Sequence, residues 1–353
     1  MSIPQYLIGL DLGTTHIVVA YARLDQPQDR VLWRIPQWTQ RNQIESLPYL
    51  PSFRYHPSEE EKAQFAEPLP WPVVSVEGDF SPVVIGQWAR VLQGSVPERT
   101  VHSAKSWLSQ PLVDRLSPIL PWGNSSDVAR VSPVVATASY LAYLRDAWNA
   151  EHPNALFQTQ EIVLTLPASF DEVARMLTLK AVDLAGLTSV RLLEEPQAAF
   201  YDWIATHHHA DYTDGFHFQR LSQNSSDQNL RLQTLSPQKK WALVCDVGGG
   251  TTDFSLIEVV YDAACDDVQY KRVAVGEHLL LGGDNLDYAL VYYLLQEKLG
   301  EKNAPSATRL NQWLSALRHA KEVLLSDAAP DELSVSVLGS GTNLFRGLQS
   351  CVL

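Results

Sequence analysis

Apolar residues fall into two patterns along the chain, and each pattern predicts a different kind of element. Short apolar runs predict strands at residues 6–10, 17–21, 161–166, 190–193, 241–245, 254–260, 270–275 and 333–338. Apolar positions at helical spacing predict helices at residues 132–153, 171–185, 284–300 and 306–326, and a further helix near Pro196. Ser132 and Asp284 are the expected N-terminal caps, and Asp171 is expected to open its helix. The alternation of strands and helices between residues 132 and 206 predicts an α/β fold.

One stretch near the middle joins two of these strands through a polar turn. The run Trp241–Cys245 leads to Asp246, then to Gly248-Gly-Gly-Thr-Thr252, and then to a second apolar run. Two apolar runs around glycines predict a hairpin, and its glycines leave backbone N–H groups uncovered, which suits a phosphate. Asp246 is placed to hold a metal ion on that phosphate through water, because Mg²⁺ keeps much of its hydration.

The same arrangement occurs at the N-terminus. The run Tyr6–Leu10 leads to Asp11, then to Gly13-Thr-Thr15, and then to a second strand. A lone Gly-Gly-Gly segment is more often a simple tight turn than a binding site. Two copies of a strand–Asp–Gly/Thr-turn–strand unit instead predict two similar halves that face one phosphate chain.

Composition limits the function classes. The chain has 353 residues, enough for one large domain or two lobes, and a formal net charge of −13. This charge argues against nucleic acid or an anionic membrane surface as the main partner. No apolar run approaches the ~20 residues that span a bilayer, and the N-terminus resembles no signal peptide, so we expect a cytoplasmic protein. The cysteines lack metal-ligand spacing and are expected to be thiols: Cys245, Cys265 and Cys351.

Two segments interrupt the regular pattern. Residues 25–120 are rich in proline and tryptophan, which predicts short strands and loops rather than long helices. Residues 207–240 are polar and predict an exposed, partly disordered insertion. Adjacent residues of His207–His209 cannot all face one ion, so metal binding there is the weaker interpretation. The expected division is therefore a first lobe at 1–206, an insertion at 207–240 and a second lobe at 241–353.

Five motifs, taken in order, resemble the ATPase domain of DnaK-type heat-shock chaperones, which belongs to the actin and sugar-kinase superfamily. The motifs are Asp11-Leu-Gly-Thr-Thr15, Leu166-Pro-Ala-Ser-Phe170, Glu194-Glu-Pro-Gln-Ala-Ala199, Asp246-Val-Gly-Gly-Gly-Thr-Thr-Asp253 and Leu281-Gly-Gly-Asp284. The resemblance spans residues 5 to about 326. Sugar kinases and actin-like filament proteins fit less well on the second and third motifs.

The resemblance implies a two-lobed actin-like ATPase fold with duplicated mixed-sheet, ribonuclease-H-like lobes and a nucleotide, ATP or ADP, in the cleft between them. It implies Mg²⁺ held through water by Asp11 and Asp246. The residues that it assigns to nucleotide binding are Gly13, Thr14, Thr15, Gly248, Gly249, Gly250, Thr251, Gly282, Gly283 and Lys321. The residues that it assigns to hydrolysis are Lys105, Glu195, Asp246 and Thr251. On the residues alone, Lys105 is one lysine among many. Pro167 and Arg175 resemble a pair that relays the nucleotide state outward.

The sequence also departs from that family. Arg318 stands where the family has a ribose-binding glutamate, and Leu325 stands where it has a serine. The second adenosine motif, the closing strands and the peptide-binding domain are missing, so we expect an incomplete second lobe in a chain that was cut short. An incomplete lobe should leave an apolar face uncovered, promote association and weaken discrimination between nucleotide bases.

These observations predict an ATP-binding, chaperone-type module that hydrolyses ATP to ADP and phosphate with Mg²⁺. The alternative is a non-catalytic nucleotide-binding or scaffold protein that kept the fold and lost turnover. Phosphotransfer to a small molecule is a third option, but the sequence offers no identifiable substrate base. Unfolded polypeptide or co-chaperones are the expected partners, reached through the missing C-terminal region, with no role for nucleic acid or membrane.

Overall fold

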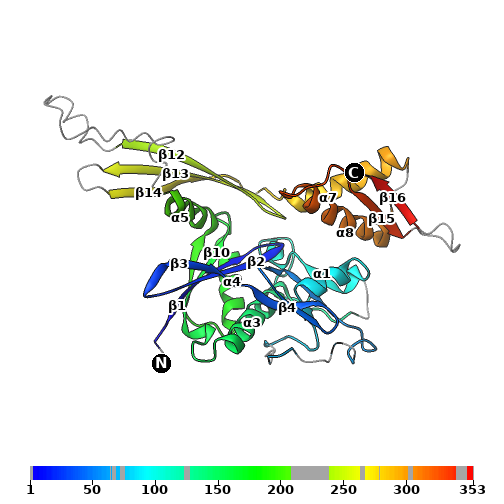
Figure 1. Cartoon of the computed structure of the whole chain (residues 1–353), viewed down its shortest axis with the longest axis horizontal. Helices are drawn as coiled ribbons and strands as arrows, with labels where there is room; N and C mark the ends of the chain where they lie inside the picture. Colours follow the sequence, from blue (N-terminus) through cyan, green and yellow to red (C-terminus); the bar gives the residue numbers. More distant parts are fainter. Residues whose placement is uncertain are drawn as a thin grey trace.

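The computed structural model describes residues 3–63, 65, 69–71, 76–122, 128–207, 238–262, 267–277, 279–300, 305–338 and 348–352. The elements up to residue 207 form one lobe, and the elements from residue 238 onward lie beside it in a second (Figure 1). The chain thus has the two-lobed α/β architecture that the repeated turn units predict.

The first lobe is built on a six-stranded mixed sheet. Its strands are β1 (Tyr6–Leu12), β2 (His16–Arg23), β3 (Gln26–Leu32), β6 (Leu50–Pro51), β10 (Glu161–Leu166) and β11 (Val190–Glu194). The order is β11-β10-β1-β2-β3, with β6 also paired to β2. Strand β1 pairs in parallel with β10 and antiparallel with β2, so it lies inside the sheet. Because β1 is paired on both sides, the turn that follows it has a fixed position.

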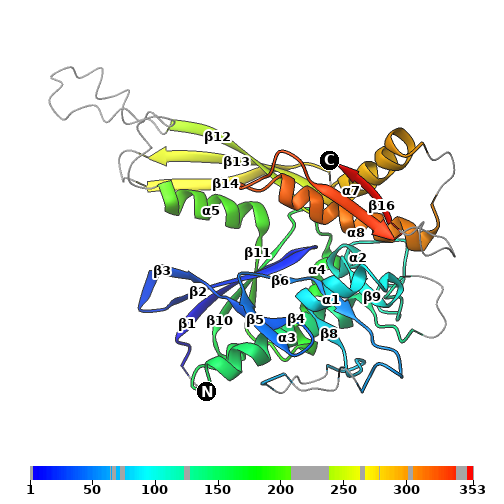
Figure 2. The ribbon, with the colours of Figure 1, turned by 45° about the vertical axis from the view of Figure 1, so that its right-hand side comes forward.

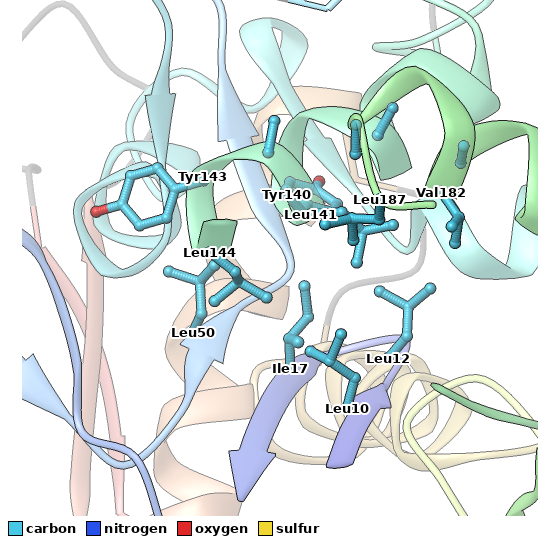
Figure 3. Close-up of a cluster of buried hydrophobic side chains, with 14 of the residues drawn as sticks. Leu10, Leu12, Ile17, Leu50, Tyr140, Leu141, Tyr143, Leu144, Val182 and Leu187 are labelled. Atoms are coloured by element: carbon cyan, nitrogen blue, oxygen red, sulfur yellow. The ribbon is translucent and has the colours of Figure 1, made fainter. Parts of the chain in front are cut away.

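Two helices cover one face of this sheet. Ser132 caps α3 (Pro133–Glu151) by accepting a hydrogen bond from the Val135 amide, and Asp171 caps α4 (Glu172–Leu184) in the same way. Leu10, Leu12 and Ile17 point from β1 and β2 toward α3, as Figure 3 shows. The remaining side chains that Figure 3 labels around them are Leu50, Tyr140, Leu141, Tyr143, Leu144, Val182 and Leu187. This buried cluster anchors the first turn unit.

Residues 25–120 form short elements, as predicted. The strands are β4 (Ile35–Gln40), β5 (Gln43–Leu47), β7 (Phe53–Tyr55), β8 (Val84–Ile85) and β9 (Thr100–His102), and the helices are α1 (Gln87–Gln93), the 3-10 turn η1 (Pro97–Arg99) and α2 (Ala104–Leu108). Strands β4 and β5 form a hairpin, and β8, β7 and β9 form a small sheet. A further 3-10 turn, η2 (Phe157–Thr159), precedes β10.

A buried ionic cluster fixes part of this segment. The Arg54 side chain is fully buried on β7 and pairs with the carboxylate of Asp79. Its Nε donates to Nε2 of His56 at 2.9 Å, so His56 carries its proton on Nδ1 and donates it to the Ala129 carbonyl at 2.7 Å. Burial, and then the Arg54 charge, lower the pKa of His56 to about 3. The imidazole is therefore neutral at physiological pH.

The second lobe begins with a long antiparallel sheet. Its strands are β12 (Gln238–Val247), β13 (Thr252–Asp262) and β14 (Asp267–Val275), in that order. Helix α5 (Glu195–His207) lies beneath this sheet (Figure 2), where Phe200 packs against Ile257 and Val259. The helix belongs in sequence to the first lobe, and it joins the two lobes physically.

A second unit completes the described part of this lobe. It contains α7 (Gly283–Tyr293), the π-helical turn η3 (Leu294–Lys298), α8 (Ala307–Leu324) and the hairpin of β15 (Ser334–Leu338) and β16 (Leu348–Val352). Its core includes Leu294, Trp313 and Leu317. None of the helices in the described ranges is long and apolar enough to cross a bilayer.

The elements predicted from residue 132 onward are confirmed, with two corrections. Gly282, not Asp284, caps α7; its amide donates to Oδ1 of Asn285 at 2.8 Å, and Asp284 lies in the first helical turn. Residues 238–240 belong to β12, so the predicted polar insertion ends by residue 237; residues 208–237 and Cys265 lie outside the described residues. The strands β3 to β9 and β16 had no individual prediction.

Candidate functional site: charged side chains beside two glycine turns

The first turn joins β1 to β2 and is held from the side. A Cβ atom on Gly13 would lie 2.3 Å from the His16 carbonyl oxygen, so only glycine fits there. Ser52 ties the turn to the segment after β6: its Oγ donates to the Gly13 carbonyl, and its amide donates to the Thr15 carbonyl, both at 2.9 Å. Thr14 and Thr15 are thereby fixed at the edge of the sheet.

The second turn joins β12 to β13 and is held from behind. The Gly248 amide donates to the Thr251 carbonyl at 2.9 Å and closes the turn. The amides of Gly283 and Asp284 donate to the carbonyls of Gly248 and Gly249 at 3.0 and 2.7 Å. A Cβ atom on Gly282 would lie 2.6 Å from those same carbonyl oxygens. The Gly282-Gly283 pair therefore shapes the second turn by close backbone contact.

The two turns face each other across the lobes. A Cβ atom on Gly249 would lie 2.3 Å from Cγ2 of Thr15, and one on Gly250 would lie 3.2 Å from Cγ2 of Thr14. Ser106 on α2 also borders Gly250, and its Oγ lies 3.4 Å from Oγ1 of Thr14. The two turns are thus close neighbours in this structure.

Lys105 and Glu195 form an ion pair beside the turns. The Lys105 Nζ on α2 lies 2.5 Å from Oε1 of Glu195 at the start of α5, and both side chains are largely buried. Burial raises the pKa of Glu195 to about 7; Lys105 opposes the rise, whereas the negative charges of Asp11 and Asp246 add to it. A largely buried carboxyl group with a pKa near neutrality is a candidate for proton transfer or for orienting water.

The two aspartates lie close enough to act on that carboxyl group. Asp11 ends β1, where Oγ1 of Thr165 donates to its Oδ1 at 2.8 Å. Burial raises the pKa of Asp246, while Lys105 and a hydrogen bond with Glu195 oppose the rise. Within the described ranges no group of three or more His, Cys, Asp or Glu side chains could hold a metal ion.

Lys321 lies behind the second turn. Its Nζ donates to the Gly283 carbonyl at 2.8 Å and pairs with the fully buried Asp287 at 2.6 Å. Arg318, one helical turn earlier on α8, pairs with Asp284 and Asp287, each at 2.8 Å. The cations of α8 thus join α8 to the start of α7, which in turn supports the second turn.

The predicted relay residue Arg175 lies near the Lys105–Glu195 pair. Its Nη2 contacts Oε1 of Glu194 at 3.1 Å, and Arg272 of β14 contacts the other oxygen of the same carboxylate. Glu194 is the residue before Glu195, so this ionic cluster joins α4, β11 and the second lobe one residue from Glu195.

Several residues of the site had no prediction from sequence. Thr165 orients Asp11, Ser52 and Ser106 border the turns, and His16 contacts Thr15. His16 had one available signal, because it is a polar residue that directly follows the first turn and begins a strand. The other three come from segments 37 to 154 residues away from their partners in the chain, and nothing local marks them.

Two mixed α/β lobes with paired glycine turns fit the class of proteins with the actin-like ATPase fold. Within that class the chain belongs to the Hsp70 family, because the family model described as Hsp70 protein matches residues 125–339. Similar curated proteins include the chaperone protein HscA homolog of Pseudomonas putida, 28% identical over 341 residues, and that of Acinetobacter baumannii, 26% identical over 348 residues. The chaperone protein HscA of Cronobacter sakazakii is 27% identical over 331 residues.

These alignments cover most of this chain but less than half of each relative. They include 93%, 96% and 94% of this chain and 43%, 45% and 44% of the respective relatives. The activity, substrates and partners of the whole relatives are therefore only proposals for this chain.

Proposed function

We propose that this chain binds Mg–ATP between its two turns and hydrolyses it to ADP and phosphate, as the ATPase module of a chaperone. The observation that supports this best is the convergence of Lys105, Glu195, Asp11 and Asp246 beside two apposed glycine turns from different lobes. A protein that only needed the fold would not require four charges in one cleft.

The residues present fit this ligand. The turn glycines leave backbone N–H groups uncovered, and Thr14, Thr15 and Thr251 add hydroxyl donors for phosphate oxygens. Asp11 and Asp246 offer hard oxygen ligands at the adjacent strand ends, which suits a largely hydrated Mg²⁺. When bound, Mg²⁺ would offset the negative charge of the phosphates.

The chain's own groups have distinct proposed roles in hydrolysis. Ionised Glu195 orients water toward the γ-phosphorus and takes up its proton as the bond to the bridging oxygen breaks. Lys105 stabilises the charge on the γ-phosphoryl oxygens in the transition state. In this structure the two groups are paired through Nζ of Lys105 and Oε1 of Glu195, which leaves Lys105 with further N–H donors and Glu195 with its second oxygen for these roles.

Binding and turnover can be tested separately. We expect calorimetry to detect Mg–ATP binding by the wild type and a large loss in Asp246→Ala. Lys105→Ala should lower kcat about 10²–10³-fold and change affinity much less, because its contact strengthens in the transition state. Lys180→Ala, an exposed lysine on α4, is the matched control. Equal binding by wild type and Asp246→Ala would refute the assignment of the second turn.

A second candidate function is nucleotide binding without turnover. It is favoured by Arg318, which stands in place of the family's ribose-binding glutamate and is held by Asp284 and Asp287. Mg–ATP binding with the same hydrolysis rate in wild type and Lys105→Ala would select this candidate. Unfolded polypeptide and co-chaperones are the proposed partners, and the word chaperone in the names of the relatives supports the first of these.

A further inference from the structure

His16 connects the first turn to a contact between the lobes. It begins β2 directly after Thr15, and its Nδ1 lies 3.1 Å from Oγ1 of Thr15. Its Nε2 lies 3.4 Å from Nη1 of Arg90 on α1. The edge of Tyr49 packs against the imidazole, with the ring centroids 4.5 Å apart. The ring is therefore held from three sides.

The partners of the imidazole decide which nitrogen carries its proton. Arginine stays protonated and can only donate, so Nε2 of His16 must accept from Arg90. Nδ1 then carries the hydrogen and donates it to Oγ1 of Thr15. Burial, and then the Arg90 charge, lower the pKa of His16 to about 4, which keeps the ring neutral and preserves this arrangement.

The hydrogen bond from His16 defines the Thr15 hydroxyl as a hydrogen-bond donor. Since Oγ1 already accepts a hydrogen, its own hydrogen is free to be donated to another acceptor. The methyl group of Thr15 borders Gly249, which restricts rotation of the side chain. Thr15 is thus prepared as a donor beside the second turn.

Arg90 also reaches the other lobe. Its Nη2 pairs with Glu322 on α8, and these two side chains, together with Tyr49 and Arg318, line a cavity of about 650 Å³ between α1 and α8. The guanidinium group that fixes Nε2 of His16 is therefore the same group that links the two lobes. A change in the interlobe pair would alter the partner of His16.

We propose that His16 is a positioning residue: its Nδ1–H sets the Thr15 hydroxyl as a donor to nucleotide phosphate, and its Nε2 links that setting to the Arg90–Glu322 contact. The proposal rests on the proposed nucleotide site. The proposal predicts that separation of α1 from α8 weakens phosphate binding by the first turn. Opening of the lobes is thereby coupled to nucleotide release.

Two variants separate the two ring nitrogens. His16→Asn places an amide near the position of Nδ1 and can still donate to Thr15, whereas His16→Gln places its amide near Nε2 and can still accept from Arg90. A neutral hydrogen bond contributes modestly, so we expect His16→Gln to weaken Mg–ADP binding about 3–10-fold and His16→Asn to remain within about twofold. Thr15→Val should lose about as much Mg–ADP affinity as His16→Gln. The double variant should lose no more affinity than either single variant.

Nuclear magnetic resonance of the nucleotide-free protein gives an independent measurement. In protein labelled with ¹⁵N-histidine, His16 should be neutral at pH 7 with its hydrogen on Nδ1, and Arg90→Gln should raise its pKa. A hydrogen on Nε2, or equal losses of Mg–ADP affinity in His16→Asn and His16→Gln, would overturn the proposal. A wild type that binds no nucleotide would refute the proposed function, while the spectrum would still show whether His16 is set as described.

Discussion

The two turn units follow the same sequence order, but among the described residues only the first has its apolar face covered. Ile8 and Leu243 each lie three residues before the aspartate, and Leu12 and Val247 each lie one residue after it. Ile8 and Leu12 are 0% and 2% exposed, whereas Leu243 and Val247 are 63% and 68% exposed. Local sequence thus produces the turn in both lobes, while protection of the strand depends on elements from elsewhere in the chain.

The position of each leading strand explains the difference. Strand β1 lies between β10 and β2, and α3 covers the face that carries Ile8. Strand β12 is the edge of its three-stranded sheet, and in the described part of the chain its outer face stays exposed. Such a face is prone to association; association itself stays a prediction.

The largest expected effect is on stability and separates the two strands directly. Ile8→Ala removes a fully buried side chain and should lower the free energy of unfolding by about 2–5 kcal/mol. Leu243→Ala, at the equivalent exposed position, should cost about 0.5 kcal/mol or less. Urea denaturation followed by tryptophan fluorescence measures both. Equal costs would mean that the outer face of β12 is covered in solution.

A second expected effect concerns acid and the buried cluster of the first lobe. The folded pKa of His56 is about 3, below its ordinary 6.5, so the unfolded chain binds more protons between these values. Stability is therefore complete above pH 6.5 and falls as the pH decreases. At pH 5 the titration of His56 should lower the free energy of unfolding by about 2 kcal/mol. In His56→Gln the side chain can still accept a hydrogen bond from Arg54 but cannot titrate. The decrease in the free energy of unfolding between pH 7.5 and pH 5 should therefore be about 2 kcal/mol smaller than in the wild type. An unchanged decrease would contradict the burial of His56.

The smallest expected effect concerns the pH dependence of turnover. Burial raises the pKa of Glu195 to about 7, so its carboxyl group ionises as the pH rises through 7. If ionised Glu195 orients water, kcat/KM, which reports the pKa values of the free enzyme, should rise about tenfold per pH unit below 7 and level off above it. In Glu195→Gln the residual rate should show no such rise. A wild-type profile that is flat between pH 5.5 and 8 would remove Glu195 from this role.

The sequence predicted the two turns and the elements after residue 132 because each depends on neighbouring residues. Periodic apolar positions, capping residues and glycine turns are all local signals. The strands of residues 25–120 lack such signals: β3 is exposed along its whole length, and β6 and β8 have two residues each. Tertiary pairing, rather than propensity, makes them strands.

The site divides in the same way. The positions of Asp11 and Asp246 follow from their turn units, whereas Lys105 was assigned only by resemblance, because its partner Glu195 lies 90 residues away. The Arg90–Glu322 contact joins residues 232 positions apart, and no pattern in one sequence indicates it. Contacts between lobes become visible only once the lobes are placed together.

The central claim is that two turns from different lobes act on one ligand, and a double-mutant cycle tests it most directly. Calorimetry would measure Mg–ATP binding by wild type, Asp11→Asn, Asp246→Asn and the double variant. If both carboxylates hold one hydrated Mg²⁺ on one phosphate chain, each single variant should bind much more weakly than wild type. The double variant should then be little weaker than the singles, with a coupling of about 1 kcal/mol or more. Wild-type affinity in either single variant, or additive losses in the double, would contradict a shared site.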